Sequence, residues 1–113
     1  MPPRPTSRNE LLAGTMDLLI LQTLTLGRMH GYAIARHIER CSEELLRVEQ
    51  GSLYPALERL QRKGWVKSAW GTSPTGRDAR YYTITASGRK RLGQKISAFD
   101  DLALAISRVL GRA

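Results

Sequence analysis

Basic side chains are concentrated in one stretch of this 113-residue sequence, whose formal net charge is +8. Between residues 59 and 95, ten lysines and arginines face a single acid, Asp78, which gives that stretch a net charge of +9. The rest of the chain is therefore close to neutral. A positive field confined to one region favours a polyanionic partner, and nucleic acid is the first candidate.

Residues suited to catalysis or metal binding are few. The chain has two histidines, His30 and His37, and one cysteine, Cys41. The His37–Cys41 pair would supply only two metal ligands, and no other cysteine or carboxylate cluster has metal-ligand spacing. We therefore expect no enzyme and no cofactor, a structural hydrogen-bonding role for His30, and a small buried apolar role for Cys41. A lone cysteine forms no internal disulfide, which is typical of the cytoplasm.

Composition divides the chain into a tail, a domain and a last helix. Residues 1–6 (MPPRPT) are predicted to be a disordered tail and have no signal-peptide pattern. Residues 7–85 would form one domain and residues 86–113 a separate helix. The longest apolar run, residues 18–26, is too short to cross a bilayer, so we expect no membrane partner.

The predicted order of elements is that of a winged helix-turn-helix, a mainly α (α+β) fold. The first helix begins either at Ser7, with Glu10 at capping-box spacing, or at Thr15 with Asp17, and it ends near residue 26. Three further helices are predicted, at 32–41, 53–63 and 86–110. Ser52 caps the second of these and Gly64 follows its end, while Thr85 caps the third. Strands 65–70 and 79–85 form a hairpin around the loop 71–78.

The helix predicted at 53–63 has one apolar and one polar face. At about 100° per residue, Leu53, Leu57 and Leu60 share the buried side. The opposite side and the N-terminal end carry Gln50, Ser52, Pro55, Glu58, Arg59 and Arg62, with Tyr54 at the flank. A recognition helix presents its N-terminal residues to base edges and its arginines to bases or phosphates. We expect Gln50, Ser52, Pro55, Arg59 and Arg62 to contact DNA, and Tyr54 either to contact DNA or to pack on the hairpin.

Pro55 is an unusual residue so near the start of a helix. If Ser52 is the cap, Pro55 lies in the first turn, where a missing N–H costs little. Its compact ring then either touches a thymine methyl group or a sugar, or only stiffens the helix start.

The hairpin is predicted to be the wing. Its loop and flanks carry Thr72, Ser73, Thr75, Arg77 and Arg80. Hydroxyl groups, free backbone amides and guanidinium groups suit phosphate contact, and Arg77 or Arg80 would also fit a minor groove. Lys67 adds a cation to the first strand, while Trp65 and Trp70 are expected to anchor the wing on the core.

The last helix carries an apolar seam at heptad spacing. Its members are Leu92, Ile96, Phe99, Ala103, Ile106 and Leu110, with Leu102 and Val109 widening it. A helix of roughly 37 Å is longer than a small winged domain can cover. The seam therefore predicts a homodimer, which would present two recognition helices to a pseudo-palindromic site. The alternative is a helix that folds back on its own domain.

Three segments resemble a known family. They are GTMDLLILQTL…HGYAIARHIE (14–39), VEQGSLYPALERLQRKGWV (48–66) and RDARYYTITASGRKRL (77–92). From about residue 11 to residue 110 the chain resembles the PadR-type transcriptional regulators, and with one helix after the wing it resembles their short subfamily. The resemblance implies a dimeric repressor that binds operator DNA through the third helix and the wing, with Ser52 and Tyr54 at the DNA surface.

The resemblance also implies a small-molecule effector, because some family members release DNA on binding phenolic acids or other aromatic or hydrophobic compounds. The short relatives use aromatic residues near the dimer interface, and Phe99 is the only aromatic residue of the last helix here. Two other interpretations stay open: a MarR-like winged-helix regulator, against which GSLYPALERL argues, and a winged-helix module that binds protein or RNA.

Overall fold

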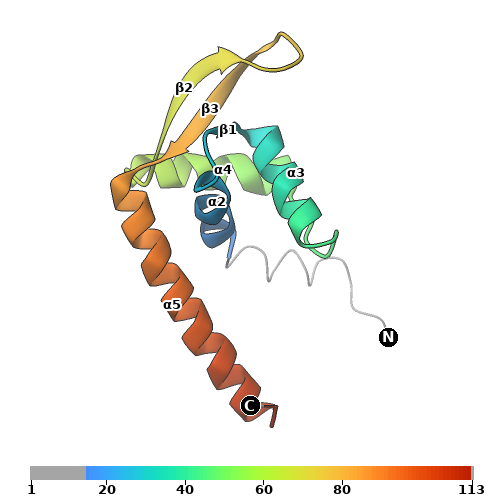
Figure 1. Ribbon diagram of the computed structural model, residues 1–113, viewed down its shortest axis with the longest axis vertical. Coiled ribbons are helices and arrows are strands. Elements are labelled where there is room, and N and C mark those ends of the chain that lie inside the picture. The colour runs from blue at the N-terminus through green and yellow to red at the C-terminus, as the bar shows by residue number, and fades with distance from the viewer. Residues whose placement is uncertain (1–14, 113) are drawn as a thin grey trace.

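The computed structural model describes residues 15–112, which form helices and one three-stranded antiparallel sheet (Figure 1). The elements are α2 (Met16–Leu24), β1 (Met29–His30), α3 (Gly31–Cys41), α4 (Gln50–Arg62), β2 (Val66–Thr72), β3 (Asp78–Ile84) and α5 (Ala86–Val109). This confirms the mainly α winged helix-turn-helix. The predicted tail at 1–6 and the Ser7–Glu10 capping box lie outside the described residues.

The core is built around α2, which lies between α3, α4 and α5 (Figure 1). Ile20, Leu21 and Leu24 of α2 are almost completely buried, and so are Leu53 and Leu57 of α4. Because α2 is buried on more than one side, its apolar residues are not confined to one stripe, and its leucines are closely spaced in the sequence. The buried faces fix how α4 is oriented on the rest of the domain.

A short strand that the sequence did not reveal joins the helices to the wing. Met29 of β1 pairs with Tyr82, and His30 pairs with Tyr81. His30 is also the N-cap of α3, where its Nδ1 accepts a hydrogen bond from the amide of Ala33 at 3.1 Å. The structural role predicted for His30 is confirmed. Two residues are too few to show strand periodicity, so β1 had no detectable signal.

The wing hairpin is longer and its tip shorter than predicted. Strands β2 and β3 pair from Val66 and Ile84 to Thr72 and Asp78, which leaves a tip of residues 73–77. Trp65 packs against the core as expected. Trp70 does not, because it lies far out along β2 with 68% of its surface exposed.

The start of α5 is fixed to the winged domain at one corner. The hydroxyl of Thr85 accepts a hydrogen bond from the amide of Gly88 at 3.0 Å and donates one to the carbonyl of Gly64 at 2.7 Å. A Cβ at Gly88 would collide with the carbonyl of Trp65, so only glycine fits there. Leu92, one turn further on, is 6% exposed and belongs to the core of its own protomer. The prediction that Leu92 lies in a dimer seam is therefore wrong.

We expect Gly88→Ala to lower the free energy of unfolding by about 1–3 kcal/mol, because a methyl group has no room beside the Trp65 carbonyl. Urea denaturation followed by circular dichroism measures this. The matched control is Gly93→Ala, five residues later in α5, where a Cβ would meet nothing within 4 Å. Equal stability of Gly88→Ala and the wild type would contradict the close contact at the corner.

Candidate nucleic-acid interface

The predicted recognition helix begins three residues earlier than the sequence indicated. The first residue of α4 is Gln50, its N-cap is the extended Glu49, and the Leu53 amide donates to the Glu49 carbonyl at 2.9 Å. Ser52 is therefore inside the helix and is not its cap. Pro55 is the sixth helical residue, beyond the first turn, so the argument that its missing amide costs little is wrong.

Pro55 removes a hydrogen bond from the exposed side of α4. In an α-helix the amide at position 55 would donate to the carbonyl of Gly51, and proline has no such amide. The helix is nevertheless continuous to Arg62. Burial of Leu53, Leu57 and Leu60 holds it together, since most helix stability in proteins comes from packing of the apolar face.

The exposed face of α4 carries most of the side chains that the sequence assigned to it. Gln50, Ser52, Tyr54, Pro55 and Arg62 are exposed. They extend along the surface of α4 away from α2. The structure therefore brings the predicted base-reading residues onto one continuous helical surface.

Arg59 is the exception on α4. Its Nη2 lies 2.7 Å from Oδ1 of Asp17, and the pair links α4 to the first turn of α2. The ion pair lies at the edge of the contact between α4 and α2, and the Arg59 side chain keeps 42% of its surface exposed. Arg59 therefore has a structural role that its separation of 42 residues from Asp17 concealed, and its DNA contact stays a prediction.

Tyr54 packs on the helix-turn-helix as well as facing solvent. A Cβ at Gly31 would lie 2.7 Å from the Tyr54 hydroxyl oxygen, so the tyrosine ring rests directly on the first residue of α3. The side chain remains 41% exposed. The Tyr54 ring thus packs closely on Gly31 of α3, and it also lies beside Tyr82 and Arg80 of the hairpin.

The wing is tied to α4 by a chain of polar contacts. The Ser68 hydroxyl donates to Oε1 of Gln61 at 3.1 Å, and Nη1 of Arg80 donates to the Ser68 hydroxyl at 3.0 Å. The Arg80 guanidinium also lies 4.8 Å from the ring centre of Trp70. Arg80 is exposed, and these contacts lay its side chain along the hairpin.

Tyr82 forms part of the floor between α4 and the wing. It lines a groove of about 660 Å³ together with Tyr54, Glu58, Gln61, Arg62 and Arg80. Burial raises the pKa of the Tyr82 hydroxyl above its ordinary value of 10.0; Arg80 opposes this shift, and Tyr54 and Glu58 add to it. The hydroxyl is therefore protonated and neutral over the physiological pH range.

The wing tip is an ordered turn whose backbone amides are in use. The Ser73 amide donates to the Arg77 carbonyl at 2.7 Å, the Gly76 amide to the Ser73 carbonyl at 2.9 Å, and the Arg77 amide to the Ser73 hydroxyl at 3.2 Å. The expectation of free amides for phosphate binding is wrong at these three positions. Within residues 15–112 the guanidinium of Arg77 has no hydrogen-bond or ion-pair partner, so it is available.

A large, positively lined cleft separates α3 from the wing. Its volume is about 950 Å³, and four arginines line it with one acid, Asp78. The arginines are Arg36 and Arg40 of α3, Arg77 of the tip and Arg80 of β3. Glu39 already pairs with Arg36 at 3.2 Å. A concave, cationic site of this size suits a sugar-phosphate backbone.

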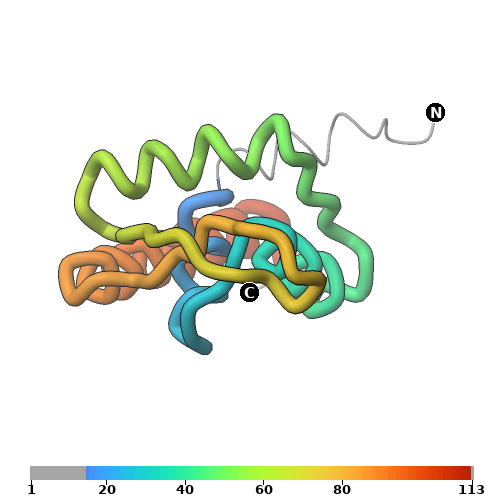
Figure 2. The backbone as a smooth tube through the Cα atoms, turned by 90° about the horizontal axis from the view of Figure 1, so that it is seen from above, coloured from blue at the N-terminus to red at the C-terminus, as the bar shows by residue number. Residues whose placement is uncertain are grey.

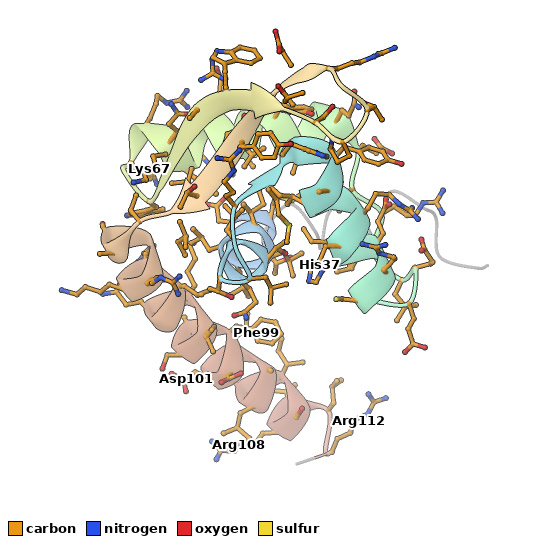
Figure 3. All side chains as sticks on the ribbon, turned by 45° about the horizontal axis from the view of Figure 1, so that its top comes forward. His37, Lys67, Phe99, Asp101, Arg108 and Arg112 are labelled. Atoms are coloured by element: carbon orange, nitrogen blue, oxygen red, sulfur yellow. The ribbon has the colours of Figure 1, made fainter. Side chains whose placement is uncertain are left out.

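The two faces of the wing carry different predicted residues. Strand pairing places Thr72 opposite Asp78 and Trp70 opposite Arg80, so Thr72 and Arg80 share one face. Lys67 pairs with Thr83 and therefore lies on the other face, at the base of the hairpin (Figure 3). Seen from above in Figure 2, the hairpin and α4 run in roughly the same direction, and Figure 1 shows the hairpin rising away from α4 toward its tip.

Part of the basic stretch lies away from α4 and the wing tip. Lys63, Arg91 and Lys95 surround the Trp65 ring, with their charged groups 4.9, 5.0 and 6.0 Å from its centre. These cations belong to the corner between α4 and α5. The charge count from the sequence therefore overstates the number of cations that reach the predicted DNA surface.

Little in the part of the chain that the structure describes covers the seam of α5 beyond Leu92. Ile96, Phe99 and Ile106 are exposed, the last two by about half, and the seam residues Leu102, Ala103, Val109 and Leu110 are exposed as well. In Figure 1 this part of α5 runs away from the domain. The alternative of a helix folded back on its own domain does not describe this segment.

Cys41 is exposed, so its prediction as a buried apolar residue is wrong. Its Sγ lies 3.2 Å from Nε2 of His37, one turn earlier on α3. Among residues 15–112, no group of three or more histidines, cysteines and carboxylates is arranged to hold a metal ion. No helix in this part of the chain is long and apolar enough to span a membrane.

Three short helices, a hairpin wing and a cationic face over the third helix define a winged-helix regulator of transcription. The model of the PadR-like family of transcriptional regulators matches residues 20–94, and the chain belongs to that family. Regulators of this family bind DNA and are not enzymes.

Solved structures agree with this assignment. A transcriptional regulator from Clostridium thermocellum is 30% identical, with 88% of this chain and 96% of that chain covered at a TM-score of 0.81. A PadR family transcription regulator from Clostridium difficile is 28% identical, with 86% and 99% covered at a TM-score of 0.74. An uncharacterized protein from Lysinibacillus sphaericus is 23% identical over 95 residues, which are 84% of this chain and 87% of that protein.

We expect Asp17→Asn and Arg59→Gln each to lower the free energy of unfolding by up to about 1 kcal/mol, since the ion pair is partly exposed. The double variant should lose little more free energy of unfolding than either single variant, because both changes remove the same interaction. Urea denaturation of the four proteins completes this cycle. Additive losses would show that the pair is not coupled and that Arg59 is free for another role.

Proposed function

We propose that this regulator is a repressor that binds a pseudo-palindromic operator as a homodimer in the cytoplasm. The observation that carries the proposal is the joint surface of α4 and the wing tip. Within residues 15–112 neither Arg62 nor Arg77 has an acid partner. Arg62 lines the groove between α4 and the wing, and Arg77 lines the cationic cleft of about 950 Å³. Uncompensated arginines flanking a polar helix face are what operator binding requires.

On this proposal the roles of the surface residues follow their positions. Gln50, Ser52 and Pro55 face base edges in the major groove, and Tyr54 lies at the side of that contact. Arg62, Thr72 and Arg77 bind phosphates, with Arg77 also placed to enter a minor groove. Lys67 lies on the other face of the wing, and Arg80 is hydrogen-bonded to Ser68. Both therefore add to the positive field of the wing and do not form the main contacts.

The proposed dimer uses α5 from Ile96 onward. The seam consists of Ile96, Phe99, Leu102, Ala103, Ile106, Val109 and Leu110. Their exposure would be costly in a monomer, and a second copy of the same helix covers them under two-fold symmetry. Leu92 contributes by fixing α5 to the domain, so that the two DNA-reading surfaces have a defined relative position.

A small aromatic or hydrophobic effector would have a candidate place between α2 and α5. A groove of about 270 Å³ between α2 and α5 has Leu18, Phe99 and Leu102 in its lining. Because α5 carries the proposed dimer seam and α2 supports α4, a compound bound there would change the spacing of the two recognition helices. We propose this groove as the place where an effector would act to release DNA.

The remaining alternatives differ in their partner. Family membership argues against a MarR-like assignment. A winged helix that binds protein or RNA would also carry basic residues, but it would not prefer a duplex with an inverted repeat. Salt-dependent binding that is tighter to one palindromic duplex than to random duplex favours the operator.

We expect Arg77→Ala and Arg62→Ala each to weaken operator binding roughly tenfold, because each removes a charged hydrogen-bond donor to phosphate. Each change should also reduce the slope of log affinity against log salt by about 1. Fluorescence anisotropy at several salt concentrations measures both quantities.

The control for these two variants is Arg108→Ala. Arg108 lies near the far end of α5, away from α4 and the wing (Figure 3). Its removal should leave the affinity and the salt slope unchanged. Unaltered binding by both Arg62→Ala and Arg77→Ala would show that the assigned surface is wrong.

We expect Phe99→Glu and Ile106→Glu to convert the dimer to a monomer, because each buries a charge in the apolar seam. Light scattering coupled to size exclusion gives the mass directly. Ser97→Glu is the control, since Ser97 is exposed on the other side of the same helix and should leave the dimer intact. A stable dimer in all three variants would reject the seam.

A further inference from the structure

Gly51 is a glycine that the folded chain itself does not need. Of the glycines that the structure describes, Gly27, Gly64, Gly76 and Gly111 have a positive φ, while Gly31, Gly71 and Gly88 lie where a Cβ would meet another group at 3 Å or less. Gly51 and Gly93 have neither reason. Among residues 15–112, a Cβ at Gly51 would meet nothing within 4 Å, and its backbone is helical and exposed.

Gly51 also lies next to a second residue type that is unfavourable in a helix. It is the second residue of α4, four residues before Pro55, so the two lie one turn apart on the same side of the helix. Both residue types are unfavourable inside helices, glycine for its conformational freedom and proline for its missing amide. Ser52 beside them is also small. The first two turns of α4 thus expose a strip, Gly51–Ser52–Pro55, with almost no side-chain height.

A strip of this kind allows very close approach from outside. An α-helix with its side chains is about 10–12 Å across, and the major groove of B-DNA is about 12 Å wide. A helix fits such a groove deeply only where the side chains facing the floor are short. The strip lies at the N-terminal end of α4, where a recognition helix meets base edges.

We infer that the Gly51–Ser52–Pro55 strip is where the backbone of α4 lies directly against base edges, and that Gly51 is glycine because a methyl group there would hold the helix out of the groove. This inference rests on the proposed operator binding. It gives Gly51 the role of a specificity-determining residue, although it has no side chain with which to form a bond.

An internal explanation for Gly51 makes the opposite prediction. The ring of a proline crowds the carbonyl four residues earlier, which here is that of Gly51. If glycine were needed only to relieve that crowding, Gly51→Ala would destabilise the protein. Replacing Pro55 at the same time would then restore stability.

The experiment compares the full-length wild type with Gly51→Ala, Gly51→Ala/Pro55→Ala and the control Gly93→Ala. The probes are the duplex that the wild type selects from a random pool and a scrambled duplex of the same composition. Thermal melting and light scattering accompany anisotropy titrations with both probes.

We expect Gly51→Ala to melt no lower than the wild type, to remain a dimer, and to bind the selected duplex at least tenfold more weakly. Its binding to the scrambled duplex should change less than twofold, because non-specific binding depends on phosphates. Gly93→Ala should match the wild type with both probes.

Three results would overturn the inference. Wild-type affinity of Gly51→Ala for the selected duplex would refute it while leaving the proposed function intact. An equal loss of affinity for both duplexes would show that Gly51 lies against phosphates and not against base edges. If Gly51→Ala lowers the melting temperature and Gly51→Ala/Pro55→Ala restores it, Gly51 is glycine only to relieve crowding by Pro55. If the wild type selects no duplex, the proposed function fails, and this inference fails with it.

Discussion

The burial of one face of α4 against α2 is the interaction on which the proposed DNA-reading surface depends. Leu53, Leu57 and Leu60 are almost completely buried there, and Arg59 adds an ion pair to Asp17 at the edge of the same contact. This packing keeps α4 helical through Pro55, which a free peptide of the same sequence would not tolerate well. It also directs the opposite face outward, with the small residues at one end and Arg62 at the other.

Internal contacts decide which cations are available for a partner. Arg59 is neutralised by Asp17, Arg80 is held by Ser68 and Trp70, and three further cations surround Trp65. Among the described residues of the basic stretch, 59–95, the cations that remain are Arg62, Lys67, Arg77, Arg89 and Lys90, and of these Arg62 and Arg77 lie on the exposed face of α4 and on the wing tip. A net charge of +9 between residues 59 and 95 therefore attracts a polyanion in general, while the geometry selects a small subset of side chains for direct contact.

Elements with strong periodicity or clear caps could be predicted from the sequence. The helix at 86–110 and its Thr85 cap are confirmed almost to the residue, because a hydroxyl at the cap and a long apolar repeat act locally. The start of α4 was missed because its cap, Glu49, has no typical capping side chain. The two-residue β1, the ion pair of Arg59 and the burial of Leu92 depend on contacts between distant segments, which local patterns do not encode. The exposed positions of Cys41 and Trp70 show the same limit, since residue type alone suggested burial for both.

We propose that two copies of this winged domain, joined by α5, read the two halves of one operator. Hydroxyl-radical footprinting of the wild type on the duplex that it selects tests this most directly. We expect two protected segments related by two-fold symmetry, with centres about 10–10.5 base pairs apart or a multiple of that spacing. A single protected half-site, or uniform protection without symmetry, would contradict it.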